Sequence, residues 1–237
     1  DNTDKIVTLV DECKNMGLTL LPPDVNFGQY KFTVNEDNEI VYGIGAVKGV
    51  GEGPIEAIIG AREAGGPFSD LFDFCARVDI KKTNKRVLER LVKSGAMDAL
   101  GPKLADGAPN RGVMFATLPE AIKAAEQHAK AESLGQDDLF GLINEEPEDT
   151  RQTFKDVAPW PEEVWLDGEK ETLGLYLTGH PINRYLAEVK HYASSRIVGV
   201  QPTGKDKSAT VVGLVLGVRV LVNKRGKRWA LVTLDDK

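Results

Sequence analysis

Apolar residues recur along most of this chain three and four positions apart, which is the spacing of one helical face. The pattern predicts helices at residues 4–15, 43–48, 54–64, 69–77, 85–93, 117–132, 161–177 and 182–189. Alternating, β-branched segments predict two hairpins, one from strands 30–34 and 39–42 and one from strands 211–222 and 229–234. The predicted fold class is therefore mainly α, followed by the first strands of a β-domain. A two-stranded hairpin is marginal alone, so we expect the chain to be a fragment of a longer protein.

Glycines and capping residues mark the ends of the predicted helices. Ser69 and Asn84 are favourable N-caps, and Thr117 with Glu120 has the spacing of a capping box. A Gly-Val-Gly turn at 49–51 joins the short first helix to the helix that begins near Pro54. A second glycine turn at 94–96 follows the helix at 85–93, so the order of a helix, a glycine turn and a second helix occurs twice.

Composition indicates a folded, cytoplasmic protein without a membrane segment or a metal site. The chain has 237 residues, of which 41% are hydrophobic, and no apolar run approaches the ~20 residues that span a bilayer. Cys13 and Cys75 lie far apart without neighbouring metal-ligand spacing, so we expect two buried, reduced thiols. The three histidines are also unclustered. We expect no metal and no cofactor to be bound by this segment.

The net charge of −6 is unevenly distributed along the chain. Residues 80–93 hold six basic side chains against Glu89 alone, and residues 219–228 hold five basic and no acidic side chains. Acidic residues gather instead at 144–149. Two basic surfaces separated by an acidic stretch keep nucleic acid open as a partner.

The turn at 49–51 does not have the glycine spacing of a nucleotide-binding loop. The GxGxxG pattern would need glycine at Lys48 or at Pro54, and the phosphate-loop pattern GxxxxGK followed by Ser or Thr does not occur. Two helices joined by Gly-Val-Gly fit a helix-hairpin-helix element, with a plain helical corner as the alternative. The second glycine turn and the basic helix favour the helix-hairpin-helix element.

Such an element predicts binding to the phosphates of DNA without reading its bases. Backbone amides of Gly49, Val50 and Gly51 and the helix N-terminus near Pro54 would hold phosphates, with charge from Lys48. Phosphates farther along would be held by Lys85, Arg86, Arg90, Lys93 and Gly95. About four phosphate contacts predict a log–log salt slope near −3.6, or a loss of roughly a hundredfold between 50 and 200 mM salt.

The pentapeptide QDDLF at 136–140 lies between two glycines and beside the acidic stretch. By itself it is typical of a helix end that tucks Leu139 and Phe140 inward. Its position favours a second interpretation, in which both side chains are anchors for the pocket of a partner protein. Burying them is worth ~3–6 kcal/mol before ordering costs, so we expect a weak tether that DNA binding strengthens.

No catalytic constellation is evident in the sequence. Carboxylates are numerous, but no pair or triad lies on strands as a two-metal site requires. Asp235 and Asp236 come nearest, and a turn at a strand end is the simpler role for them. We therefore predict no catalytic residue in this chain.

Six stretches together resemble the bacterial replicative DNA polymerase III alpha subunit, and the resemblance covers essentially the whole chain. They are YGIGAVKGVGEGPIEAII, FDFCARVD, NKRVLERLVKSGAMDALG, AAEQHAKAESLGQDDLFG, LDGEKETLGLYLTGHPINRYL and VRVLVNKRGKRWALVTLDD. The resemblance implies that residues 1–32 end the fingers, that 33–190 form a tandem helix-hairpin-helix region, and that 196–237 begin an OB-fold.

The resemblance also implies sites and partners. In that family the first hairpin binds double-stranded DNA behind the active site, which here corresponds to Lys48, Gly49, Val50, Gly51 and Gly53. A peptide of the family docks on the beta sliding clamp, and here it corresponds to Gln136, Asp138, Leu139 and Phe140. Other polymerase III holoenzyme subunits would bind outside this segment. The nucleotidyl-transfer carboxylates, and the Mg²⁺ they use, are likewise expected elsewhere in the parent polymerase.

Two functions of other classes stay open. A helix-hairpin-helix repair glycosylase or nuclease would need a catalytic Asp or Lys just beyond the hairpin and would incise damaged duplex. A protein-only adaptor would not bind DNA at all.

Overall fold

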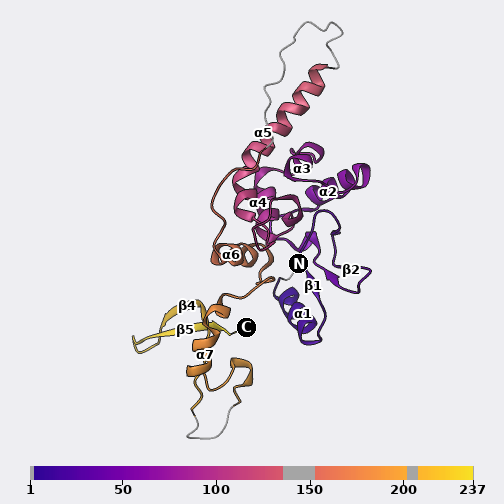
Figure 1. Cartoon of the computed structure of the whole chain (residues 1–237). Helices are drawn as coiled ribbons and strands as arrows, with labels where there is room; N and C mark the ends of the chain where they lie inside the picture. Colours follow the sequence, from indigo (N-terminus) through magenta and orange to yellow (C-terminus); the bar gives the residue numbers. More distant parts are fainter. Residues whose placement is uncertain (1–2, 136–152, 202–207, 237) are drawn as a thin grey trace. The chain divides into compact units, whose positions relative to one another are not determined.

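The computed structural model describes residues 3–135, 153–201 and 208–236 (Figure 1). The chain forms two compact units, Asp1–Leu177 and Thr178–Lys237, which we describe separately. The assignment of residues 1–32, 33–190 and 196–237 to three regions of a larger protein stays a prediction.

The first unit begins with a helix and a small sheet. Helix α1 spans Thr3–Asn15, which confirms the helix predicted at 4–15. Strands β2 (Thr33–Val34) and β3 (Ile40–Val41) pair antiparallel, a shorter form of the predicted hairpin. Strand β1 (Leu20–Leu21) pairs parallel with β3 on its other edge and was not predicted, because two residues are too few to form an alternating pattern.

A helical body follows the sheet in the first unit. It consists of the 3₁₀ helix η1 (Ile44–Ala46), α2 (Glu52–Gly65), α3 (Leu71–Arg77), α4 (Lys85–Ser94), the 3₁₀ helix η2 (Asp98–Leu100), α5 (Arg111–Gly135) and α6 (Glu162–Leu173). Helix α5 packs against α3 and α4, and α6 packs against α4 (Figure 1). Fully buried side chains from successive elements, including Tyr42, Ile55, Phe74, Leu88 and Leu118, form one continuous core.

The helix ends confirm one predicted cap and correct another. Asn84 caps α4, because its Oδ1 accepts the Val87 amide at 3.2 Å. Helix α3 is capped by Asp70 and not by Ser69, since Asp70 Oδ1 accepts the amides of Phe72 and Asp73 at 2.8 and 2.9 Å. Ser69 lies one position too early for its side chain to reach those amides.

The predicted capping box at Thr117 is wrong. Helix α5 begins at Arg111, where Asn110 Oδ1 accepts the Val113 amide at 3.2 Å. The Thr117 hydroxyl is inside the helix, donating to Val113 O at 2.8 Å, and it also accepts the Lys155 amide at 3.0 Å. A serine or threonine that bonds back to the preceding turn is compatible with a helix interior, so the spacing alone was misleading.

Helix α6 is shorter than predicted. It ends at Leu173, four residues before the predicted end at 177, because Gly174 adopts a left-handed φ of 83° and its amide donates to Lys170 O. Left-handed glycine is a frequent helix terminator. The prediction placed the terminator at Gly179 because the apolar pattern continues through the residues after Gly174.

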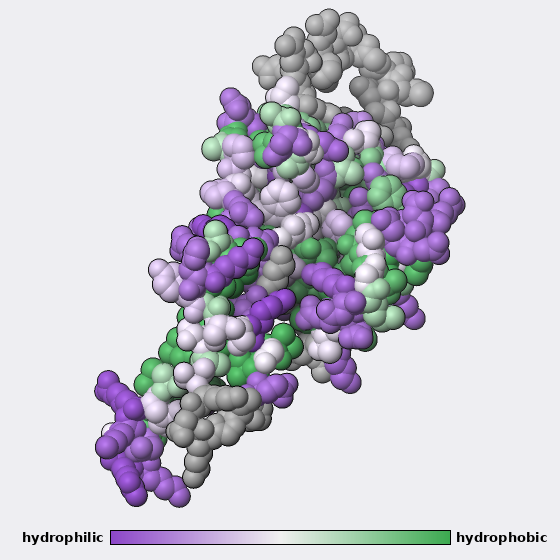
Figure 2. All heavy atoms as spheres, turned by 60° about the horizontal axis from the view of Figure 1, so that its bottom comes forward, coloured by the Kyte–Doolittle hydropathy of each residue, from purple (hydrophilic) through white to green (hydrophobic). Residues whose placement is uncertain are grey.

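The second unit contains short helices and the predicted hairpin. The elements are η3 (Pro181–Tyr185), α7 (Leu186–Tyr192), η4 (Ile197–Gly199), β4 (Leu214–Val222) and β5 (Arg228–Asp235). Strands β4 and β5 pair antiparallel, with a register shift between Val215 and Gly217. Many large apolar side chains of both strands are exposed, and green apolar patches lie among purple hydrophilic residues in Figure 2.

The two cysteines differ in exposure. Cys75 is buried as predicted, whereas Cys13 is only half-buried because it lies on the partly exposed helix α1. None of the helices described is both long and apolar enough to cross a membrane.

Candidate nucleic-acid interface

The turn at 49–51 has an exposed glycine backbone and is fixed to the core by the side chain of Val50. Gly49 has a left-handed φ of 84°, a conformation that favours glycine, and Gly51 is the extended N-cap of α2. Val50 between them is only 7% exposed and joins the hydrophobic core. Its neighbours Lys48, Gly49 and Gly51 are exposed. The buried valine thus anchors a turn whose glycine backbone faces solvent.

The amides of this turn divide into bonded and available groups. The Lys48 amide donates to Thr172 O at 2.8 Å, and the Val50 amide donates to Val47 O at 3.2 Å. Within the described part of the chain, the amides of Gly49, Gly51 and Gly53 have no acceptor. They lie at the N-terminus of α2, a helix of 14 residues, where the helix dipole adds positive potential. This arrangement suits an anion such as a phosphate oxygen.

Helix α4 is amphipathic in the way the sequence predicts. Val87, Leu88, Leu91 and Val92 are buried, while Lys85 and Arg86 on the opposite side are exposed. Lys85 makes a loose ion pair with Glu89, with its Nζ 3.8 Å from Glu89 Oε1. The basic face of α4 is therefore accessible to solvent.

Arg90 brings the basic helix and the glycine turn together. A Cβ placed on Gly49 would lie 3.6 Å from Arg90 Nε and 3.7 Å from Arg90 Cγ, so the arginine side chain lies against the turn. The sequence predicted two phosphate sites at some distance from each other. The structure places Gly49 and Arg90 in one continuous surface.

Gly95, predicted as a DNA contact, has a different environment. It is buried, has φ of 85°, and its amide donates to the carbonyls of Leu91 and Val92 as the C-cap of α4. The turn at 94–96 leads into η2, so it does not repeat the exposed turn at 49–51. Since its amide is already bonded and buried, we leave Gly95 out of the interface.

A buried ionic cluster lies beneath the surface and was not predicted. Arg111 bonds both carboxylate oxygens of Asp98 at 2.8 and 2.7 Å and reaches Glu169 Oε1 at 3.1 Å. The Arg111 and Glu169 side chains are 1% and 0% exposed. Glu169 also accepts the Trp165 indole N–H at 3.0 Å and the Leu177 amide at 2.8 Å. The cluster joins η2, α5 and α6 behind the basic helix.

Glu171 on α6 pairs with two basic residues of α4. Its Oε1 lies 2.8 Å from Arg90 Nη1 and its Oε2 lies 2.7 Å from Lys93 Nζ. The hydrogen bond from Lys93, followed by the positive charges of Lys93 and Arg90, lowers the pKa of the Glu171 carboxyl, so it is ionised at neutral pH. Arg90 and Lys93, two of the predicted DNA contacts, are thus already in ion pairs with a carboxylate of the same chain.

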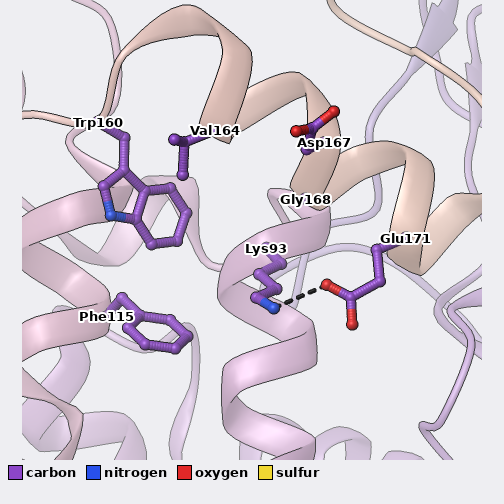
Figure 3. Close-up of a pocket in the computed structure, with 7 residues that line it drawn as sticks. All are labelled: Lys93, Phe115, Trp160, Val164, Asp167, Gly168 and Glu171. Atoms are coloured by element: carbon purple, nitrogen blue, oxygen red, sulfur yellow. Dashed lines mark hydrogen bonds and ion pairs between the residues drawn. The ribbon is translucent and has the colours of Figure 1, made fainter.

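A pocket of about 340 Å³ opens beside this pair. Figure 3 shows Phe115 and Trp160 on one side of it and the Lys93–Glu171 ion pair on the other. The two aromatic rings are 5.4 Å apart, and Lys93 Nζ lies 5.9 Å from the Phe115 ring centre. The pocket therefore adjoins the basic face of α4.

The other predicted sites fall in the second unit or outside the described residues. The basic residues at 219–228 belong to the β4–β5 hairpin of the second unit, where the tip and both strands are exposed. The peptide with Gln136, Asp138, Leu139 and Phe140 falls outside the described residues. Among the residues that are described, no three His, Cys, Asp or Glu side chains are grouped to hold a metal ion.

Comparison with known proteins supports the helix-hairpin-helix interpretation. A model of the helix-hairpin-helix motif matches residues 17–106, which include η1, the glycine turn, α2 and α4. The whole chain is also similar to DNA polymerase III subunit alpha of several bacteria. It is 56% identical to the protein of Vibrio cholerae over 237 residues and 58% identical to that of Escherichia coli K12 over 238 residues. Identity to the Pseudomonas aeruginosa protein is 49% over 245 residues.

The alignments cover this chain completely but only part of each relative. The chain spans 20% of the Vibrio cholerae and Escherichia coli proteins and 21% of the Pseudomonas aeruginosa protein.

Proposed function

This chain corresponds to about a fifth of the bacterial DNA polymerase III alpha subunit and contains a helix-hairpin-helix region, and on that premise we propose that it holds duplex DNA during replication. The observation that carries the proposal is the exposed turn at 49–51, whose free amides lie beside the basic helix α4. Backbone amides and cations together recognise phosphates and not bases. The proposed binding is therefore independent of DNA sequence.

Each element of the interface has a distinct task in this proposal. The amides of Gly49, Gly51 and Gly53 donate to the oxygens of one phosphate at the α2 N-terminus, and Val50 holds the turn in place from the core. Lys48 supplies charge beside that phosphate. The next phosphates along the strand meet the α4 side chains Lys85, Arg86, Arg90 and Lys93.

Catalysis belongs to the parent protein in this proposal. We expect the complete subunit to be a DNA-directed DNA polymerase that transfers nucleotides with Mg²⁺, and we assign no catalytic residue to the present chain. Duplex held at the helix-hairpin-helix surface would be the newly made product. The contribution of this chain to synthesis is retention of that duplex.

A second attachment point is proposed for the peptide at 136–140. Gln136, Asp138, Leu139 and Phe140 would dock on the beta sliding clamp, as the resemblance implies. The clamp tether and the DNA surface then act on the same duplex. Binding at one of these two sites raises the effective concentration of the partner at the other site. We also propose that β4 and β5 are the first strands of an OB-fold, because their exposed apolar faces need further strands to cover them.

Three variants test the two attachment points separately. Gly51→Asp places a carboxylate among the free amides, and Leu139→Ala with Phe140→Ala removes both anchors of the peptide. Gly60→Asp is the matched control, because Gly60 is an exposed glycine of α2 with open space around it and the charge change is the same. Aspartate is a favourable N-cap, so Gly51→Asp should not weaken α2.

Binding of each variant to duplex DNA and to the clamp is measured by fluorescence anisotropy. We expect Gly51→Asp to lose DNA binding only and the double variant to lose clamp binding only, with Gly60→Asp close to the unmodified chain. A log–log salt slope near −3.6 is expected for about four phosphates. A flat salt response contradicts phosphate binding. Incision of damaged duplex would favour a repair enzyme, and absence of DNA binding would favour a protein adaptor.

A further inference from the structure

The carboxylate of Glu171 lies where the basic helix would otherwise present two unpaired cations. One oxygen is 2.8 Å from Arg90 Nη1 and the other is 2.7 Å from Lys93 Nζ (Figure 3 shows the second pair). Arg90 is also the side chain that lies against Gly49. A single acidic group therefore bridges the cations that connect α4 with the glycine turn.

Backbone contacts fix α6 beside that turn. The residue after Glu171, Thr172, accepts the Lys48 amide through its carbonyl oxygen at 2.8 Å. One turn earlier, Gly168 lies so close to α4 that a Cβ would be 3.3 Å from Lys93 O. The position of the Glu171 carboxylate is consequently set by the packing of α6 on α4 and on the turn.

The Glu171 side chain is nevertheless accessible, with 43% of it exposed. A carboxylate and a phosphate both present paired oxygens to arginine and lysine, with similar hydrogen-bond geometry. Exposed ion pairs contribute little to stability, so exchanging one acceptor for another is inexpensive. A DNA phosphate can therefore take the place of the carboxylate without rearranging the fold.

We propose that Glu171 is an intramolecular competitor of the DNA backbone, occupying Arg90 and Lys93 until a phosphate displaces it. The inference rests on the proposed duplex binding and names a residue that limits its strength. An enzyme that moves along DNA needs contacts that are released readily. Glu171 provides a partner to which Arg90 and Lys93 return whenever a phosphate leaves.

The test compares Glu171→Gln with Asp167→Asn in the otherwise unmodified chain. Both changes remove one negative charge from α6, and glutamine keeps the length and one acceptor oxygen of Glu171. Asp167 is an exposed residue one turn away and makes no ion pair among the described residues, so it serves as the control for net charge. Binding to one fluorescent duplex is measured between 50 and 200 mM salt.

We expect Glu171→Gln to bind duplex about tenfold more tightly at low salt, because the cations that it leaves unpaired lie close enough to the phosphates for strong attraction. Asp167→Asn should change affinity less than about twofold. The salt slope of Glu171→Gln should steepen by about 0.9, equivalent to one additional phosphate neutralised. Its advantage should then shrink roughly 3.5-fold between 50 and 200 mM. Glu171→Ala should change affinity in the same direction.

A second background checks that Glu171 acts through its two partners. When Arg90→Gln and Lys93→Gln are already present, adding Glu171→Gln should give no more than the Asp167→Asn effect. Equal affinities of Glu171→Gln and Asp167→Asn, or weaker binding by Glu171→Gln, would overturn the inference while leaving duplex binding intact. If the unmodified chain and all variants fail to bind duplex at low salt, the proposed function falls as well.

Discussion

Gly95 offers a direct test of the buried cluster behind the basic helix. Replacing it with alanine adds one methyl group at a residue whose φ is 85°. That methyl group would overlap Arg111 Nη2 and would lie 3.0 Å from both Arg111 Cζ and Asp98 Oδ2. The substitution therefore imposes backbone strain and also pushes on the Arg111–Asp98 ion pair.

The backbone strain and the disturbance of the ion pair can be estimated separately. A left-handed conformation costs alanine about 1–2 kcal/mol. The guanidinium of Arg111 cannot retreat freely, because it is 1% exposed and bonded to both Asp98 and Glu169. Disrupting a buried ion pair typically costs about 3–5 kcal/mol, so we expect Gly95→Ala to lower the free energy of unfolding by about 4 kcal/mol or more.

Gly107→Ala is the matched control. Gly107 has φ of 84° but no atom within 4 Å of the added Cβ, so only the strain of about 1–2 kcal/mol applies. Urea unfolding is followed by tryptophan fluorescence, with Trp229→Phe in every variant to remove the signal of the second unit. Trp160 and Trp165 then report on the first unit, and Trp165 lies directly over Arg111, 4.5 Å from ring centre to Cζ.

Equal losses in Gly95→Ala and Gly107→Ala would refute the reasoning, because they would mean that Arg111 yields without cost. Loss of DNA binding by Gly95→Ala with unchanged stability would instead restore Gly95 as a contact. That outcome would contradict the buried, bonded environment of its amide.

Two further predictions concern single side chains. Burial, with a smaller effect from the negative charge of Asp70, raises the pKa of Cys75 to about 12. Iodoacetamide at pH 8 should therefore alkylate Cys13 and leave Cys75 unmodified until the chain unfolds. Equal labelling of both cysteines in the folded chain, measured by peptide mass spectrometry, would contradict this prediction. Asp70→Ala removes both capping hydrogen bonds of α3 and should lower the free energy of unfolding, measured in urea, by about 1 kcal/mol. Ser69→Ala should lower it little. The reverse order of the two losses would favour Ser69 as the cap.

The glycine turn and the basic helix were predictable from the sequence because their causes are local. A Gly-Val-Gly segment before Pro54 specifies a turn and a helix start within a few residues. The cap at Asn84 and the apolar spacing of α4 are likewise read from neighbouring positions, and the structure confirms both. The error at Ser69 arose because the true cap, Asp70, is the next residue. The error at Thr117 arose because α5 already begins six residues earlier, at Arg111, which leaves Thr117 inside the helix.

The relations between those elements were decided by tertiary structure. Arg111 meets Glu169 across 58 positions, and Lys93 meets Glu171 across 78. No periodicity links residues so far apart, since packing of α5 and α6 on α4 brings them together. Sequence alone therefore determined which residues could attract a phosphate. Only the fold determined that Gly95 is buried, that Arg90 lies against Gly49, and that Glu171 already holds two of the cations.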